Sequence, residues 1–193
     1  LTYIDSVFES LALAENERDL NEIRAELAEQ GYVRRKAGKK NQKQPALSAP
    51  LKFKTSDGFT VLVGRNNRQN DKLTMKDANN NDIWFHTKNI PGSHTVLVTD
   101  GKAPTETAME EAAVLAAQHS RAKDSAQVPV DYTQIRYVSK PQGAKPGMLY
   151  KYKIRPAAGG EADHCDPYGF WMELRPGSAS ALWPLGAVSY THL

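Results

Sequence analysis

The sequence contains a single cysteine, Cys165, so the chain cannot form an internal disulfide. A lone cysteine fits a reducing, cytoplasmic setting. No stretch approaches the roughly 18 consecutive apolar residues of a membrane span, and no charged start followed by an apolar segment marks a signal peptide. These absences predict a cytoplasmic protein that does not insert into a membrane.

The sequence also lacks the residue patterns of common active sites and metal sites. It contains no G-x-S-x-G, H-E-x-x-H or kinase-like motif, and the segment 140–147 lacks the order of a Walker loop. The five residues best suited to bind a transition metal show no spacing typical of a metal site: His86, His94, His119, His164 and Cys165. We therefore expect no catalytic residue, no metal and no cofactor, in a protein that is not an enzyme.

The formal net charge of +3 conceals an uneven distribution along the 193 residues. Residues 1–29 carry a net charge of −6, residues 30–154 carry +11, and residues 155–193 carry −2. A basic middle between acidic ends is typical of a nucleic-acid binder. A solvated basic surface without a polyanionic partner is the alternative.

Residues 1–31 are predicted to be helical, because apolar residues recur at spacings of three and four in two stripes. Asn16, with Asp19 three residues later, is suited to cap the second helix. The segment is the end of a coiled coil or a helical hairpin. Residues 32–50 are rich in Lys and Arg and predict a flexible basic linker, which either follows phosphates or only aids solubility. The two stripes consist of Ile4, Val7 and Leu11, and of Leu20, Ile23 and Leu27.

Residues 51–153 predict an α+β domain, an antiparallel β-sheet packed by one main helix. In residues 51–63, apolar and polar residues alternate on both sides of Asp57-Gly58, which predicts a β-hairpin. Further strands are expected near 83–88, 94–99 and 128–140. Residues 104–119 are predicted to form the helix. Residues 154–193 show neither strand nor helix periodicity. We interpret them as an irregular tail, disordered or non-native, and base no function on them.

One face of the predicted strand at 83–88 carries an unusual row of side chains. Period-two alternation places Trp84, His86 and Lys88 on that face, and the turn at Pro91-Gly92 brings His94 back toward His86. Trp can stack on a base, and Lys or protonated His can meet phosphate. The alternative is that Trp84 lies in the core and the histidines are structural.

Two further segments carry side chains that are suited to contact RNA; for the Asn-rich segment 65–71 the alternative is an ordinary turn. The polar segment 65–71 is expected to be a loop in which guanidinium groups grip phosphate and amides bond ribose or base edges. The Gly- and Pro-rich segment 140–147 carries lysines that can approach the phosphate backbone of a nucleic acid. The candidate residues in these segments are Arg65, Asn66, Asn67, Arg68 and Asn70, and Lys140 and Lys145.

Four of these motifs occur together and in order. They are GRNNRQND (64–71), IWFHTKNIPGSH (83–94), VDYT (130–133) and KPQGAKPG (140–147). They resemble the RNA-binding domain of the NFACT family, which includes bacterial RqcH, fibronectin-binding protein A-like proteins and eukaryotic NEMF. Residues 1–31 are similar to the end of the family's coiled coil, and residues 51–153 to its RNA-binding domain.

The resemblance implies a binding module of ribosome quality control. Such proteins recognise obstructed large ribosomal subunits carrying peptidyl-tRNA and recruit tRNA for C-terminal alanine tailing, so the large subunit, its rRNA and tRNA are the expected partners. The chain would then be the ribosome-associated, RNA-contacting part of a larger protein. The alternative is a fibronectin-binding adhesin at the cell surface, because some family members carry that name.

Overall fold

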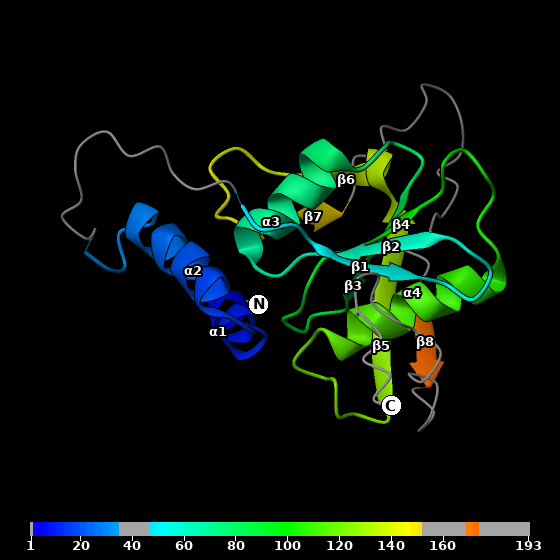
Figure 1. The fold of residues 1–193 in the computed structure, drawn as a ribbon, viewed down its shortest axis with the longest axis horizontal. Helices are drawn as coiled ribbons and strands as arrows, with labels where there is room; N and C mark the ends of the chain where they lie inside the picture. Colours follow the sequence, from blue (N-terminus) through cyan, green and yellow to red (C-terminus); the bar gives the residue numbers. More distant parts are fainter. Residues whose placement is uncertain (1, 35–46, 152–168, 174–193) are drawn as a thin grey trace, which may run out of the picture.

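The structure, a computed structural model, describes residues 2–34, 47–151 and 169–173. Six antiparallel strands form the main sheet in the order β1-β2-β4-β3-β5-β8 (Figure 1). The first four in chain order are β1 (Leu51–Lys54), β2 (Thr60–Val63), β3 (Ile83–Thr87) and β4 (Thr95–Val98). They are followed by β5 (Gln127–Gln134) and β8 (Gly169–Glu173). The predicted antiparallel sheet is therefore confirmed.

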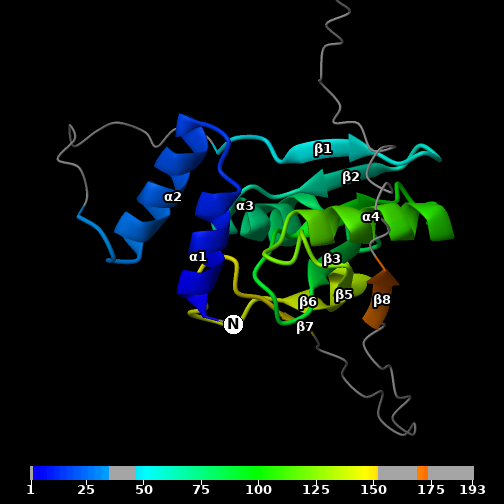
Figure 2. The same ribbon diagram turned by 90° about the horizontal axis from the view of Figure 1, so that it is seen from below.

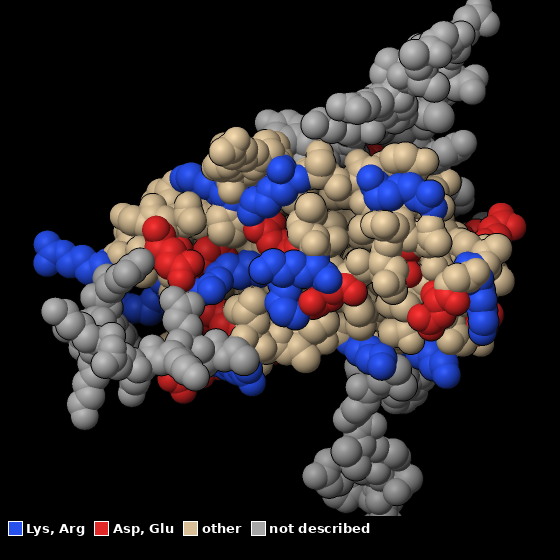
Figure 3. All heavy atoms as spheres, turned by 90° about the horizontal axis from the view of Figure 1, so that it is seen from above, with Lys and Arg blue, Asp and Glu red and all other residues tan. Residues whose placement is uncertain are grey.

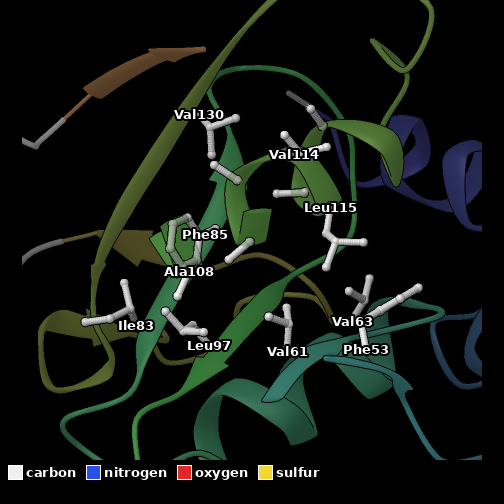
Figure 4. Close-up of a cluster of buried hydrophobic side chains, with 14 of the residues drawn as sticks. Phe53, Val61, Val63, Ile83, Phe85, Leu97, Ala108, Val114, Leu115 and Val130 are labelled. Carbon is white, nitrogen blue, oxygen red and sulfur yellow. The ribbon is translucent and has the colours of Figure 1, made fainter. Parts of the chain in front are cut away.

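Helix α4 (Glu106–Gln118) covers one face of this sheet, as predicted for the main helix. Thr105 caps it, since its side chain accepts a hydrogen bond from the amide of Ala108 at 3.0 Å. Alanines line the buried side of α4, so its backbone can approach the sheet closely. Figure 4 shows the resulting core, in which strand side chains meet this helix: Phe53, Val61, Val63, Ile83, Phe85, Leu97 and Val130 against Ala108, Val114 and Leu115.

A shorter layer covers the opposite face of the sheet. It contains α3 (Asn67–Lys72), the π-helical turn Leu73–Asp77, the 3₁₀ turn Ile135–Tyr137, and the two-stranded sheet of β6 (Val138–Ser139) and β7 (Tyr150–Lys151). Because residues directly opposite in neighbouring strands share a face, Trp84 and its partner Val96 lie here. They form a second core with Leu73, Ile135 and Val138.

The first two helices, α1 (Tyr3–Ala12) and α2 (Glu17–Glu29), form a short hairpin beside α3 at one end of the sheet (Figure 2). Tyr3, Val7 and Ile23 are buried between them. Asn16 caps α2 as predicted, because its side chain accepts from the Asp19 amide at 3.0 Å. Of the two alternatives, the described residues adopt the hairpin; a continuation as a coiled coil stays a prediction. The predicted stripes were wrong at Leu11 and Leu20, which are 40% and 47% exposed.

The remaining expectations concern the linker and the tail. Most of the predicted basic linker, residues 35–46, lies outside the described residues. The tail was expected to contain no strand, but β8 pairs with β5 from Gln127↔Glu173 to Asp131↔Gly169. The other tail residues, 154–168 and 174–193, also lie outside the described part. Among the helices that are described, none is long and apolar enough to cross a membrane.

Candidate nucleic-acid interface

Most of the polar segment 65–71 lies in helix α3, which begins at Asn67, so the expectation of a loop was wrong from that residue on. Asn66 caps α3, because its side chain accepts from the Gln69 amide at 3.0 Å. At the preceding Gly64, a Cβ would lie 2.1 Å from Oδ1 of Asn70, so only glycine fits there. The cap and this close approach fold the Asn-rich motif into a turn and a helix that packs on the N-terminal hairpin.

The two arginines of the motif contact acidic residues of that hairpin. Arg65 Nη1 lies 3.1 Å from Glu15 Oε2 and 3.4 Å from Asp19 Oδ2. Arg68 Nη1 lies 3.6 Å from Glu29 Oε1. Part of the negative charge of residues 1–29 therefore serves as the internal counterpart of these guanidinium groups. Any RNA phosphate at Arg65 or Arg68 has to compete with a carboxylate that is already in place.

A buried hydrogen-bond network joins α3 to both helices of the hairpin. Asn67 Nδ2 donates to Ser6 Oγ at 3.0 Å and to Glu26 Oε1 at 3.1 Å, and the Tyr3 hydroxyl donates to the same Glu26 oxygen at 2.7 Å. Burial raises the pKa of Glu26, while these two hydrogen bonds oppose the rise. Asn66 Nδ2 bonds Glu22 Oε2 at 2.8 Å. The amides of Asn66 and Asn67 thus connect the hairpin to the domain.

Asn70 and His94 are both buried beneath this layer. The Asn70 side chain accepts from the His94 amide at 3.1 Å, and His94 Nδ1 lies 2.9 Å from Thr74 Oγ1. Burial, with a smaller contribution from the neighbouring His86, lowers the pKa of the His94 ring to about 3. His94 is therefore neutral near pH 7, and it cannot meet a phosphate as a cation.

The predicted return of the chain to β3 is confirmed by an aromatic cluster. The ring centroids of His86 and His94 are 5.6 Å apart, and Trp84 stacks on His86 at 5.7 Å with an interplanar angle of 5°. Trp84 is 4% exposed and belongs to the second core, which agrees with the alternative that this residue lies in the core. His86 is partly exposed, and Lys88 is exposed beyond the end of β3. Of the predicted row, His86 and Lys88 are the members that present surface.

The lysines of segment 140–147 lie next to the same region. Lys140 Nζ forms an ion pair with Asp71, whose other oxygen accepts from the Gly147 amide at 3.0 Å. Lys145 Nζ bonds the Tyr32 hydroxyl and lies 4.5 Å from the Tyr32 ring centroid. It also lies 4.8 Å from the ring centroid of Tyr3, so the rings of Tyr3 in α1 and of Tyr32 just after α2 hold this cation.

A cavity of about 190 Å³ opens where β3, the 140–149 segment and α1 meet. Besides predicted residues it is lined by Asp131, Asn89 and Ser6, which the sequence interpretation missed. Asp131 is the Cα partner of His86 in β5. The motif VDYT contains it, but the position of Asp131 opposite His86 depends on the register between two strands far apart in the sequence, which neither segment shows. Asn89 adopts a positive φ of 57°, a conformation to which asparagine is suited.

The charged surface is a mosaic and not a uniform basic field. Figure 3 shows Lys and Arg side chains in a broken band across one face, with Asp and Glu interspersed. No cluster of three or more His, Cys, Asp or Glu side chains suited to a metal occurs within the described residues. The site therefore combines an aromatic cavity with separate surface cations.

The family profile described as NFACT protein RNA binding domain matches residues 50–150, and the chain belongs to this family. The chain is 48% identical over 150 residues to the Rqc2 homolog RqcH of Bacillus subtilis. The matched region covers 77% of this chain and 26% of that protein. It thus spans about a quarter of that relative.

A solved structure has the same fold with a TM-score of 0.74 and 34% sequence identity. It is the C-terminal part of the fibronectin/fibrinogen-binding protein from Streptococcus suis, and the match covers 93% of this chain and 64% of that one. A separate, short similarity is to the 1,4-alpha-glucan branching enzyme of Rubrobacter xylanophilus, at 50% identity over 44 residues. It spans 6% of that enzyme, too little to carry an argument about function.

Proposed function

We propose that this chain is the RNA-binding part of a ribosome quality control protein. The carrying observation is the cavity beside His86, with the exposed Lys88 at the end of the same strand, in a chain of the NFACT RNA-binding family. The similarity to RqcH supports the quality-control role. In the complete protein, the domain would contact tRNA on obstructed large ribosomal subunits while alanine residues are added to the stalled chain.

The candidate RNA contacts fall into two groups by their exposure, with two arginines between them. His86 and Lys88 present surface directly, and Lys140 and Lys145 are partly buried in contacts that RNA can exchange for phosphate. The second group supports this surface from below: Asn66, Asn67, Asn70, Trp84 and His94 are each at most 4% exposed. Arg65 and Arg68 lie between the groups, since each is paired with a hairpin carboxylate.

Salt-dependent binding is the direct test. Binding of the chain to tRNA and to large ribosomal subunits should weaken linearly on a log–log plot of affinity against salt, because each bound phosphate releases counterions. Lys88→Ala should lower that slope by about one for a single lost phosphate contact. Lys102→Ala is the matched control, because Lys102 is also exposed but follows β4 at the opposite end of the sheet. Identical slopes for both variants would remove Lys88 from the interface.

A second candidate function is fibronectin binding. It is favoured by the likeness to the Streptococcus suis fibronectin/fibrinogen-binding protein at 34% identity. Fibronectin can be titrated in the same assay, and intact cells can be treated with protease to ask whether the domain is exposed. Fibronectin binding without binding to tRNA or ribosomal subunits would replace the RNA proposal with the adhesin.

A further inference from the structure

The cavity beside His86 has a size and a shape that fit a ring and not a whole ligand. Pockets for complete small molecules measure about 300–1,000 Å³, whereas this one measures about 190 Å³. One wall is the parallel pair of Trp84 and His86. His94 stands nearly perpendicular to the Trp84 ring, at 82° and 5.4 Å between centroids. The buried Trp84 and His94 rings thus hold the partly exposed His86 ring in place, and a planar group in the cavity can lie against it.

The polar lining adds a directional preference to this cavity. Asp131 is 4% exposed and lies opposite His86 on neighbouring strands, so both side chains are on the same sheet face. An ionised carboxylate only accepts hydrogen bonds, and its two oxygens together offer about four acceptor sites. It can therefore accept from a ligand in addition to its contacts within the protein. A group that presents an N–H₂ at this position is favoured, and one that presents a carbonyl is repelled.

The surroundings of the cavity connect it to a polyanion. Thr87 and Asn89 both line the cavity, and the exposed Lys88 stands between them in the chain. On the other side, Met148 follows the segment that contains Lys140 and Lys145. Lys88 is two residues from His86, and Lys140 is close enough to affect the charge of the cavity residue His94, so phosphates next to a bound ring would meet Lys88 directly and Lys140 in exchange for Asp71. This arrangement matches a base that is turned out of a single strand, the form in which proteins read RNA sequence.

We infer that this cavity binds one unstacked RNA base with an exocyclic amino group, which stacks on the partly exposed His86 ring, supported by the buried Trp84 and His94, and donates to Asp131. The inference rests on the proposed RNA binding and adds base selectivity to it. Among pyrimidines, cytosine presents an amino group where uracil presents a carbonyl oxygen. Carboxylates are the side chains that accept from this cytosine amino group.

The test compares short oligo(C) and oligo(U) RNAs of equal length on the full 193-residue chain at one salt concentration. The wild type should bind oligo(C) about tenfold more tightly, the lower end of the discrimination of a good base contact. Asp131→Asn should bring the ratio close to one, because an amide offers a donor as well as an acceptor. Asp124→Asn, an exposed acid after α4, is the matched control and should leave the ratio unchanged.

A second measurement does not depend on a variant. In the wild type, CMP should shift the NMR signals of the Trp84 indole and the His86 ring more than UMP does at equal concentration. Salt-dependent RNA binding with equal affinity for oligo(C) and oligo(U) would overturn the base site and leave the proposed function in place. Absence of binding to any RNA would overturn both. A preference for oligo(C) that persists in Asp131→Asn would exclude Asp131 as its source.

Discussion

Replacing Asn67 by alanine should release the N-terminal hairpin from the domain. Asn67 is 2% exposed, and its amide nitrogen bonds the carboxylate of Glu26 and the hydroxyl of Ser6, at 3.1 and 3.0 Å. A hydrogen bond to a charged group contributes about 1.5–3 kcal/mol, and one between neutral groups about 0.5–1.5 kcal/mol. The variant should therefore lose about 2–4.5 kcal/mol of docking free energy, and Glu26 stays buried with one fewer hydrogen-bond donor.

Native-state hydrogen exchange resolves this local opening from global unfolding. Amides of α1 and α2 should exchange at least about 30-fold faster in Asn67→Ala, the factor that corresponds to 2 kcal/mol, while amides of β2 and β4 keep their protection. Asn80→Ala, at an exposed position, is the control. Asn67→Asp should open the hairpin further at neutral pH, because it sets a second carboxylate beside Glu26. Unchanged protection of the hairpin in Asn67→Ala would refute the assigned role of this network.

Three other outcomes are expected. Gly147→Ala should lower the melting temperature more than Gly143→Ala. Both glycines have a φ near 75–78°, but only at Gly147 would a Cβ lie 2.4 Å from Oδ1 of Asn67. Equal melting temperatures of the two variants would contradict this. Ala112→Leu should cost about 1–3 kcal/mol in denaturant unfolding by overpacking a fully buried position, whereas exposed Thr107→Leu should change little. The His94 ring signals should not titrate between pH 8 and about 5, because its pKa is about 3 in the fold. Since the unfolded ring takes a proton below 6.5 and the folded ring does not, His94 should reduce stability as pH falls from 6.5, by up to about 1.4 kcal/mol per unit. If the free energy of unfolding fell equally steeply with pH in the wild type and in His94→Gln, this contribution of His94 would be refuted.

Much of the sheet was predictable because its signals are local. The Asp57-Gly58 turn and the alternation around it predict the β1–β2 hairpin, and the alanine-rich run predicts the helix over the sheet. The same period of two placed Trp84 and His86 on one face, and the Pro91-Gly92 turn brought His94 back to them. Each of these predictions uses residues that are close together in the sequence.

The polar motif at 65–71 was misread because a buried polar helix has no hydrophobic period. Asn66, Asn67 and Asn70 look like loop residues in the sequence, and apart from the local cap of Asn66 on the Gln69 amide, their structural roles depend on distant partners. Those partners lie on α2 or on the segment before β4, 24 to 44 positions away. The same holds for β8, because its residues show no strand periodicity and its pairing with β5 appears only in the tertiary structure.

The sequence by itself determined the strand alternation, the main helix, the family and the type of residue available to meet RNA. Only the tertiary structure decided which of those residues remain at the surface. The physical reason is that Arg65 and Arg68 carry the same charge in any context, but the fold sets carboxylates of the hairpin beside them. Strand register likewise sets Asp131 beside His86. Side-chain chemistry is a property of the residue, whereas its availability depends on partners that folding brings from elsewhere in the chain.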